Sequence, residues 1–209
     1  PDKEVLTYSV DAFLKPFRLG TAGLWQRLML CKARPVSGQK PHRDAVAEAV
    51  HATLRRCPWR ASMMGEIRQL RLRSESTAGP LNLKRGTGGA VDIELIALAG
   101  VLQAIDEDVR FGTGTIAILG QLQSLGRLSE TDGETLIANY RELRRIEAKL
   151  RLLNVPSRHE LPLDGDGSAG TSEMHQLAAL LGEPNPESIV ERCDEIRRVN
   201  RELFHRLIA

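Results

Sequence analysis

The sequence contains few aromatic residues. Phe, Trp and Tyr make up only 4% of its 209 positions, whereas Leu, Ala, Arg and Glu are abundant. Aromatic and β-branched side chains favour strands, while the four abundant residue types favour helices. The hydrophobic content of 42% is ordinary for a chain that buries a core. We therefore expect a globular, all-α protein.

A dominant charge sign is missing as well. The 29 Lys and Arg residues are nearly matched by 27 Asp and Glu residues, which leaves a formal net charge of +2. Such a balance gives no whole-chain attraction to nucleic acid or to a membrane surface. Apolar runs near the start are broken by Asp11, Lys15 and Arg18, and none reaches the roughly 18 residues of a membrane span. We expect neither a nucleic acid nor a membrane as partner.

Cysteine and histidine are scarce and unpatterned. Cys31, Cys57 and Cys193 are odd in number and far apart, which predicts reduced, packed thiols in a cytoplasmic protein rather than disulfides or a zinc site. The five histidines show no HExxH or other paired ligand spacing. No nucleophile-elbow or phosphate-loop pattern frames a serine or lysine. We therefore expect no metal site and no catalytic residue in this chain.

Apolar residues recur at helical spacing between glycine and proline breaks, which predicts a series of helices joined by short loops. The expected helices are 9–17, 24–34, 43–56, 59–75, 91–106, 115–125, 129–153, 173–181 and 187–208. Residues 91–106 are apolar nearly all round, so they should form the central helix. Small polar residues at 74–80 read as a linker, and we expect a boundary there between segments 1–78 and 79–209.

A glycine-rich turn follows this linker. Lys84 and Arg85 precede it, and a helix containing Asp92 and Glu94 follows it. The three glycines of the turn are Gly86, Gly88 and Gly89. Glycine permits positive φ and close backbone approach, and a helix N-terminus flanked by cations attracts anions. The turn could face a phosphate, join two domains, or simply lead into the helix. Asp92 and Glu94 lie about 200° apart around the helix axis, so they cannot ligate one metal ion from one face.

The helix expected over 129–153 has a basic side. It carries Arg141, Arg144, Arg145 and Lys149. Such a side is usually a solvated surface, and Glu142 and Glu147 offer ion-pair partners on the same helix. A docking surface for an acidic partner protein is the alternative interpretation.

Several segments resemble one enzyme family in the same order along the chain. Residues 83–95, LKRGTGGAVDIEL, resemble the K-x-G-x-G-G-x-x-D-I-E-F segment of bacterial glutamine-synthetase adenylyltransferases. Residues 25–38, WQRLMLCKARPVSG, are similar to that family's W-E-x-Q-A-L-x-x-A-R-x-V-x-G run. Residues 140–153, YRELRRIEAKLRLL, resemble its Y-x-x-L-R-R-x-E-x-x-L-x-L stretch, and 159–162, HELP, its H-x-L-P. Together these motifs cover nearly the whole chain.

The resemblance implies a nucleotidyltransferase domain that moves AMP from Mg-ATP to a tyrosine of glutamine synthetase, followed by a helical regulatory bundle. Segment 1–78 would be the helical tail of that domain and segment 79–209 the bundle. The sequence of residues 91–94, VDIE, resembles the second, adenylylating half of the enzyme more than the first. Glutamine synthetase and the PII signalling protein are the implied partners. In this family the turn with Lys84 and Arg85 would press against the active site, with Trp25, Lys32 and Arg34 packing or contacting phosphate from the other side.

This sequence departs from the family at the metal site. The family holds magnesium with a Gly-Ser, Asp-x-Asp segment and a later Asp, and none of these is found here. We therefore expect that the chain alone binds no cofactor and neither transfers nor removes AMP. A segment of a PII uridylyltransferase, which also has a K-x-G-x-G-G element, and a non-enzymatic helical interaction module are the alternatives.

Overall fold

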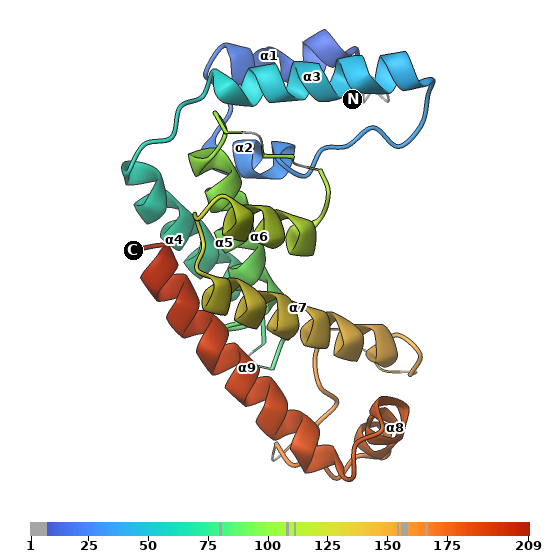
Figure 1. Cartoon of the computed structure of the whole chain (residues 1–209). Helices are drawn as coiled ribbons and strands as arrows, with labels where there is room; N and C mark the ends of the chain where they lie inside the picture. The colour runs from blue at the N-terminus through green and yellow to red at the C-terminus, as the bar shows by residue number, and fades with distance from the viewer. Residues whose placement is uncertain are drawn as a thin grey trace, which may run out of the picture.

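The structure is a computed structural model that describes residues 8–79, 81–107, 109–110, 112–153, 155, 159–165 and 167–209. Within these ranges the chain forms nine α-helices and no β-strand, apart from one isolated bridge between Asn82 and Glu160 (Figure 1). The helices are α1 (Val10–Arg18), α2 (Leu24–Leu30), α3 (Lys40–Arg55), α4 (Ser62–Glu75), α5 (Ala90–Gln103), α6 (Thr115–Ser124), α7 (Glu130–Leu150), α8 (Ser172–Leu181) and α9 (Pro186–Leu207). The expected all-α class is confirmed.

The helix starts follow from local chemistry. Ser9 caps α1 and Ser129 caps α7, in each case by accepting a hydrogen bond from the backbone three residues later. Asn185 caps α9 in the same way, and Pro186 occupies the first turn, where its missing N–H costs nothing. In α6 the cap position is Gly114, and Thr115 is the first helical residue.

One expected helix is wrong in its length. The helix expected over 24–34 ends at Leu30, because the N–H groups of Lys32 and Ala33 bond to carbonyls three residues back and the chain then becomes irregular. Pro35 disfavours the helical conformation at the residue before it. As a result, Lys32 and Arg34 lie beyond the end of α2, and their side chains extend toward α5 and α6.

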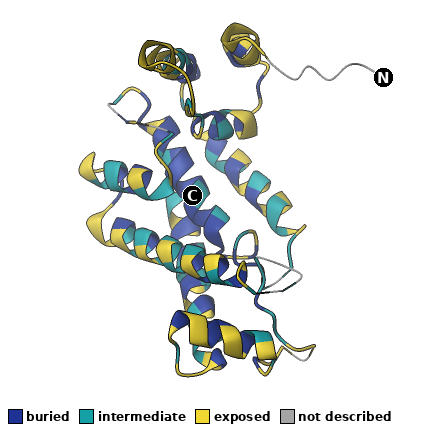
Figure 2. Ribbon diagram, turned by 90° about the vertical axis from the view of Figure 1, so that its right-hand side faces the viewer, coloured by how far each residue is buried: buried dark blue, intermediate teal, exposed yellow. Residues whose placement is uncertain are grey.

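The central element is α5. It packs against α2, α4, α6, α7 and α9, and Figure 2 shows it buried along nearly its whole length. In Figure 1, α1 and α3 lie side by side at one end of the molecule, whereas α7, α8 and α9 form the other end. The expectation that residues 91–106 supply the central helix is confirmed, with the helix itself at Ala90–Gln103.

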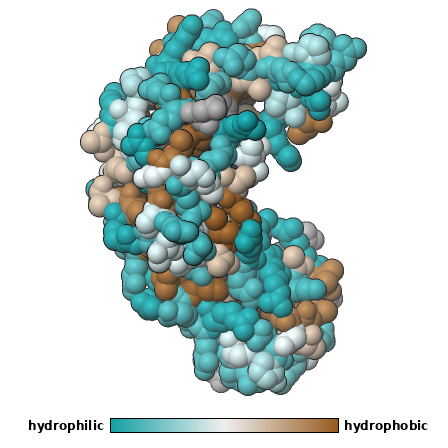
Figure 3. Space-filling model, viewed as in Figure 1, coloured by the Kyte–Doolittle hydropathy of each residue, from teal (hydrophilic) through white to brown (hydrophobic). Residues whose placement is uncertain are grey.

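Two apolar clusters make up the core. The larger one runs from α1 through α5 and α6 to the end of α9, and the smaller one joins α7, α8 and the first half of α9 to Leu83 and Ala90. Figure 3 shows apolar side chains gathered in the middle of the molecule, with mostly hydrophilic ends. Helices from both sides of residue 79 share the larger cluster.

The three cysteines are free and buried, which agrees with the expectation of packed thiols. Burial raises the pKa of the Cys31 thiol to about 12 and that of Cys193 to about 12. Both thiols are therefore protonated near neutral pH, which makes them poor nucleophiles. Of the helices in the described residues, none is long and apolar enough to cross a membrane.

The glycine turn, residues 86–89, is pressed against α9. Gly88 has a φ of +68°, and a methyl group there would overlap the carbonyl oxygen of Arg197. The Asn200 side chain donates to the Gly88 carbonyl at 2.9 Å, and the Arg197 Nε donates to the Thr87 carbonyl at 2.9 Å. The glycines thus permit a backbone contact between residues more than a hundred positions apart.

A buried charge network lies beneath the turn. The side chains of Arg71 and Asp92 are both fully buried and are hydrogen-bonded to each other. Arg71 also donates to the Gly86 carbonyl at 2.6 Å and lies 3.3 Å from Glu75. Arg201 of α9 contacts Glu75 and lies 3.4 Å from the other oxygen of Asp92. Two arginines and two carboxylates therefore join α4, α5 and α9 with no net charge.

Replacing Gly88 with alanine should destabilise the protein by more than about 2 kcal/mol, because a side chain is disfavoured at positive φ and would also collide with α9. Gly65→Ala is the matched control, since Gly65 lies within α4 with open space around its Cα. That change should stabilise the fold by about 0.5–1 kcal/mol through helix propensity. The free energy of unfolding in urea measures both. Equal effects of the two variants would contradict the proposed contact.

Replacing Asp92 with alanine should cost about 3–5 kcal/mol, because it removes the only fully buried carboxylate that pairs with the buried guanidinium of Arg71 in the described residues. The control is Asp44→Ala on α3, which breaks an exposed i,i+4 pair with Lys40. That variant should change the free energy of unfolding by less than about 1 kcal/mol. A loss at Asp92 as small as the loss at Asp44 would show that the network contributes little.

Candidate functional site

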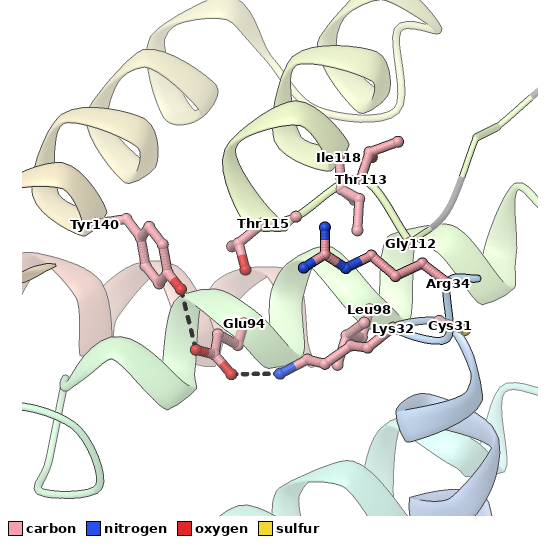
Figure 4. A pocket seen from close by; sticks show the side chains of 11 residues that line it. Cys31, Lys32, Arg34, Glu94, Leu98, Gly112, Thr113, Thr115, Ile118 and Tyr140 are labelled. Atoms are coloured by element: carbon pink, nitrogen blue, oxygen red, sulfur yellow. Dashed lines mark hydrogen bonds and ion pairs between the residues drawn. The ribbon is translucent and has the colours of Figure 1, made fainter. Parts of the chain in front are cut away.

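A cavity of about 330 Å³ opens between α2, α5, α6 and α7. Its polar wall comes from four separate parts of the sequence, and Cys31, Leu98 and Ile118 form the apolar wall. Figure 4 shows the polar side chains converging on this space. They are Lys32, Arg34, Glu94, Thr113, Thr115 and Tyr140. Three of the residues expected from the sequence to form a site, Lys32, Arg34 and Glu94, therefore meet in one place.

Glu94 is held by two partners in the cavity. Lys32 Nζ donates to one carboxylate oxygen at 2.6 Å, and the Tyr140 hydroxyl donates to the other at 3.1 Å. Burial raises the pKa of Tyr140, so the phenol keeps its proton and acts as a donor. The lysine charge offsets the carboxylate charge. The arrangement fixes α5, α7 and the segment after α2 relative to one another.

Arg34 has no hydrogen bond or ion pair within the described part of the chain. Figure 4 shows its side chain running beside that of Lys32, with the guanidinium directed toward Thr115. The cavity therefore carries a formal charge of +1 from Lys32, Arg34 and Glu94. The first turn of α6 also lines it, and the cap residue Gly114 provides no side-chain acceptor for that turn's N–H groups.

Other expected site residues lie elsewhere. Lys84 is half-buried and Arg85 exposed, with Arg85 donating weakly to Thr77 at 3.4 Å. Both lie just before the glycine turn, and neither lines the cavity. Trp25 lies on a different groove, formed between α2 and α4. Asp92 belongs to the buried network under the turn, and Glu94 faces the cavity, as their expected separation around the helix requires.

The basic side of α7 is partly used within the molecule. Arg144 donates to Glu147 at 2.5 Å, and Arg145 donates to Glu142 at 3.2 Å, which confirms the expected ion pairs within the helix. The basic residues left without a charged partner among the described residues are Arg141 and Lys149. A docking role for this side stays a hypothesis.

Several site residues were not recognised in the sequence. Neither Tyr140 nor Arg71 was among the residues that the sequence indicated for a site. A signal for Arg71 did exist, because it continues the buried positions Met63 and Ile67 at a spacing of four. Asn200, which follows Ile196 at the same spacing, is a second example. A polar residue in register with buried ones indicates a buried polar contact.

The residues present do not suit a magnesium ion. Among the described residues, no group of three or more His, Cys, Asp or Glu side chains is placed to hold a metal. In the cavity Glu94 stands alone as a carboxylate, and both of its oxygens are occupied. Magnesium prefers several oxygen ligands. We therefore derive no metal-dependent step from this chain.

The segments that resemble the adenylyltransferase family come together in space. Lys32 from 25–38, Glu94 from 83–95 and Tyr140 from 140–153 are bonded in the cavity. His159, from 159–162, accepts a hydrogen bond from the Leu83 N–H through its carbonyl at 2.7 Å, and its ring contacts Glu147 at 2.9 Å. All four segments thus belong to one connected unit.

Comparison with known proteins gives the same family. A bifunctional glutamine synthetase adenylyltransferase/adenylyl-removing enzyme from Methylococcus capsulatus is 30% identical over 88% of this chain and 19% of its own length. The proteins of the same name from Bartonella henselae and Corynebacterium diphtheriae are 26% and 27% identical, over 83% and 97% of this chain and 18% and 20% of their own lengths. The chain spans about a fifth of the length of the curated relatives it matches.

These relatives confirm the resemblance to bacterial glutamine-synthetase adenylyltransferases that the motifs indicated. The family model described as GlnD PII-uridylyltransferase matches residues 61–208, which is more than half of the sequence. That match begins one residue before α4 and includes the glycine turn, α7 and α9. The chain belongs to the family that this GlnD PII-uridylyltransferase model describes.

Proposed function

We propose that this chain is the helical part of an enzyme that transfers AMP from Mg-ATP to a tyrosine of glutamine synthetase in the cytoplasm. The observation that carries the proposal is that the four family-like segments form one connected unit. Lys32, Glu94 and Tyr140 are bonded in the cavity, and His159 contacts Leu83 and Glu147. Chance similarity between short, separate segments would not place them in contact, so their contact supports a shared structural role. The proposed reaction, adenylyl transfer to glutamine synthetase, is taken from the names of the relatives.

In this proposal, segment 1–78 is the tail of the nucleotidyltransferase domain and segment 79–209 is the regulatory bundle of the second, adenylylating half. The catalytic carboxylates and the magnesium ion belong to other parts of the enzyme. The chain's own contribution is positional: the Arg71 network fixes the glycine turn between α4 and α9. The turn then presents Lys84 and Arg85 at a defined place beside the start of α5.

A chimera tests the proposal directly. The matching fifth of the Methylococcus capsulatus enzyme is replaced by this chain, and labelled AMP transfer to glutamine synthetase is measured. We expect the chimera to retain transfer, because the connected unit is preserved, and we expect the 209 residues alone to give none. A folded chimera without activity, or turnover by the isolated chain, would contradict the proposal.

In the same chimera, Lys84→Ala combined with Arg85→Ala should lower the affinity for ATP by about tenfold or more if these cations face the phosphates. Arg60→Ala, at an exposed position before α4, is the control and should leave the affinity unchanged. Unchanged affinity in the double variant, with wild-type folding, would leave the turn a purely structural element.

A second candidate function is uridylyl transfer to the PII protein, which the description of the matching family model favours. The two candidates differ in donor and acceptor. Labelled ATP with glutamine synthetase and labelled UTP with PII, offered to the same chimera, separate them. Label on PII from UTP would favour the second candidate.

A further inference from the structure

Two asparagine side chains connect α7 to the glycine turn by way of α9. Asn139 of α7 donates through Nδ2 to Asn200 Oδ1 at 2.8 Å, and Asn200 Nδ2 donates to the Gly88 carbonyl at 2.9 Å. Asn200 is fully buried, whereas Asn139 is half-buried. The oxygen and the nitrogen of the Asn200 amide therefore face different elements, since the oxygen faces α7 and the nitrogen faces the turn.

The chemistry of these contacts fixes the orientation of the Asn200 amide. The Gly88 carbonyl can only accept a hydrogen bond, so the NH₂ group of Asn200 must point to the turn and its oxygen to α7. That oxygen is buried and needs a donor, because an unpaired buried acceptor is costly. Asn139 supplies the donor. The reversed amide would place two carbonyl oxygens against each other at Gly88.

The Asn200 amide thus has two discrete arrangements, and only one of them holds the turn. A donor at position 139 selects the arrangement that bonds Gly88, whereas a pure acceptor at that position would select the reverse. In the described part of the chain, Asn139 has a side-chain hydrogen bond to Asn200 and none to the turn. A two-state group between them can nevertheless pass a change at α7 to the turn backbone.

The next residue of α7 binds the other site on α5. The Tyr140 hydroxyl donates to Glu94 in the cavity, at 3.1 Å. Adjacent residues of one helix therefore hold the turn and the cavity, Asn139 through Asn200 and Tyr140 directly. A displacement of α7 along its axis would disturb both sets of bonds.

We propose that Asn139 and Asn200 are positioning residues for the glycine turn, with Asn139 setting the orientation of the Asn200 amide and Asn200 holding the Gly88 carbonyl. The close packing of Gly88 against the backbone of Arg197 determines where the turn lies, and the amide determines the direction of its carbonyl. Through this amide relay, α7 controls the backbone that follows Lys84 and Arg85. Any role of that control in catalysis rests on the proposed function, whereas the relay itself does not.

Asn139→Asp tests the relay in the 209-residue chain, because an ionised carboxylate only accepts. A hydrogen bond to a charged acceptor is stronger than one to a neutral carbonyl, so the Asn200 NH₂ group should turn from Gly88 toward the new carboxylate. The Gly86 and Gly89 amides, which bond to the Asn82 and Gly86 carbonyls, report on the turn by hydrogen exchange. Their protection factors should fall by about tenfold or more, and those of central α5 amides much less.

Acid should reverse this effect, which a loss of general stability would not do. A protonated carboxyl can donate to the Asn200 oxygen. Relative to the wild type at the same pH, Asn139→Asp should therefore regain part of the protection of its turn amides as the pH falls from neutral to about 4. Asn139→Ala has neither a donor nor a titratable group at this position, so it should loosen the turn at both pH values without recovery.

Ala138→Asp is the matched control, because it places the same charge on the neighbouring, exposed position of α7. Its turn amides should be protected like those of the wild type at both pH values. The proposal is overturned if Asn139→Asp leaves the turn protected, if turn and α5 amides lose protection equally, or if acid restores Asn139→Ala as well. Asn139→Ala adds no charge, so wild-type protection of its turn would overturn the proposal even if Asn139→Asp did not fold.

Discussion

The contact between the glycine turn and the last helix depends on the buried pair of Arg71 and Asp92. Two charges with no access to water are tolerated only when hydrogen bonds and opposite charges surround them. Here Glu75, Arg201 and the carbonyl of Gly86 complete the set, so the four charged groups cancel. Because the members come from α4, α5 and α9, no helix can shift alone without exposing a charge to an apolar surrounding. The network therefore defines one arrangement of these helices rather than merely adding stability.

The same logic connects the turn to the cavity through α5. Asp92 faces the buried network, while Glu94 faces the cavity and is bonded to Lys32 and Tyr140. The two carboxylates lie two residues apart on a rigid helix, so the position of one fixes the position of the other. Any rotation of α5 about its axis would therefore disturb both the contacts of Asp92 in the buried network and those of Glu94 in the cavity. The turn and the cavity are thus two faces of one element.

The sequence predicted the elements of this structure well and their partners poorly. Apolar periodicity located α7 and α9 to within a few residues, because the spacing of apolar residues is a local signal. The partner of Lys32 was missed, since Glu94 lies sixty-two residues further along the chain. Motif order brought Lys32, Arg34, Glu94 and Trp25 into one hypothesis. The structure places the first three around one cavity and Trp25 on a different groove, because the order of motifs along a chain does not say which way a side chain points. Whether the resemblance identifies the right half of the parent enzyme, and the division at residue 79, stay predictions.

The close packing of Gly88 against the backbone of Arg197 has a consequence for the order of folding. During synthesis, Arg71 and Asp92 leave the ribosome more than a hundred residues before Arg201, so the charge network and the turn stay incomplete until α9 arrives. Docking of α9 then supplies the partners of the turn, the last arginine of the charge network, and the side chains that the end of α9 adds to the larger core. The last long helix is therefore the element whose arrival makes the rest of the fold cooperative.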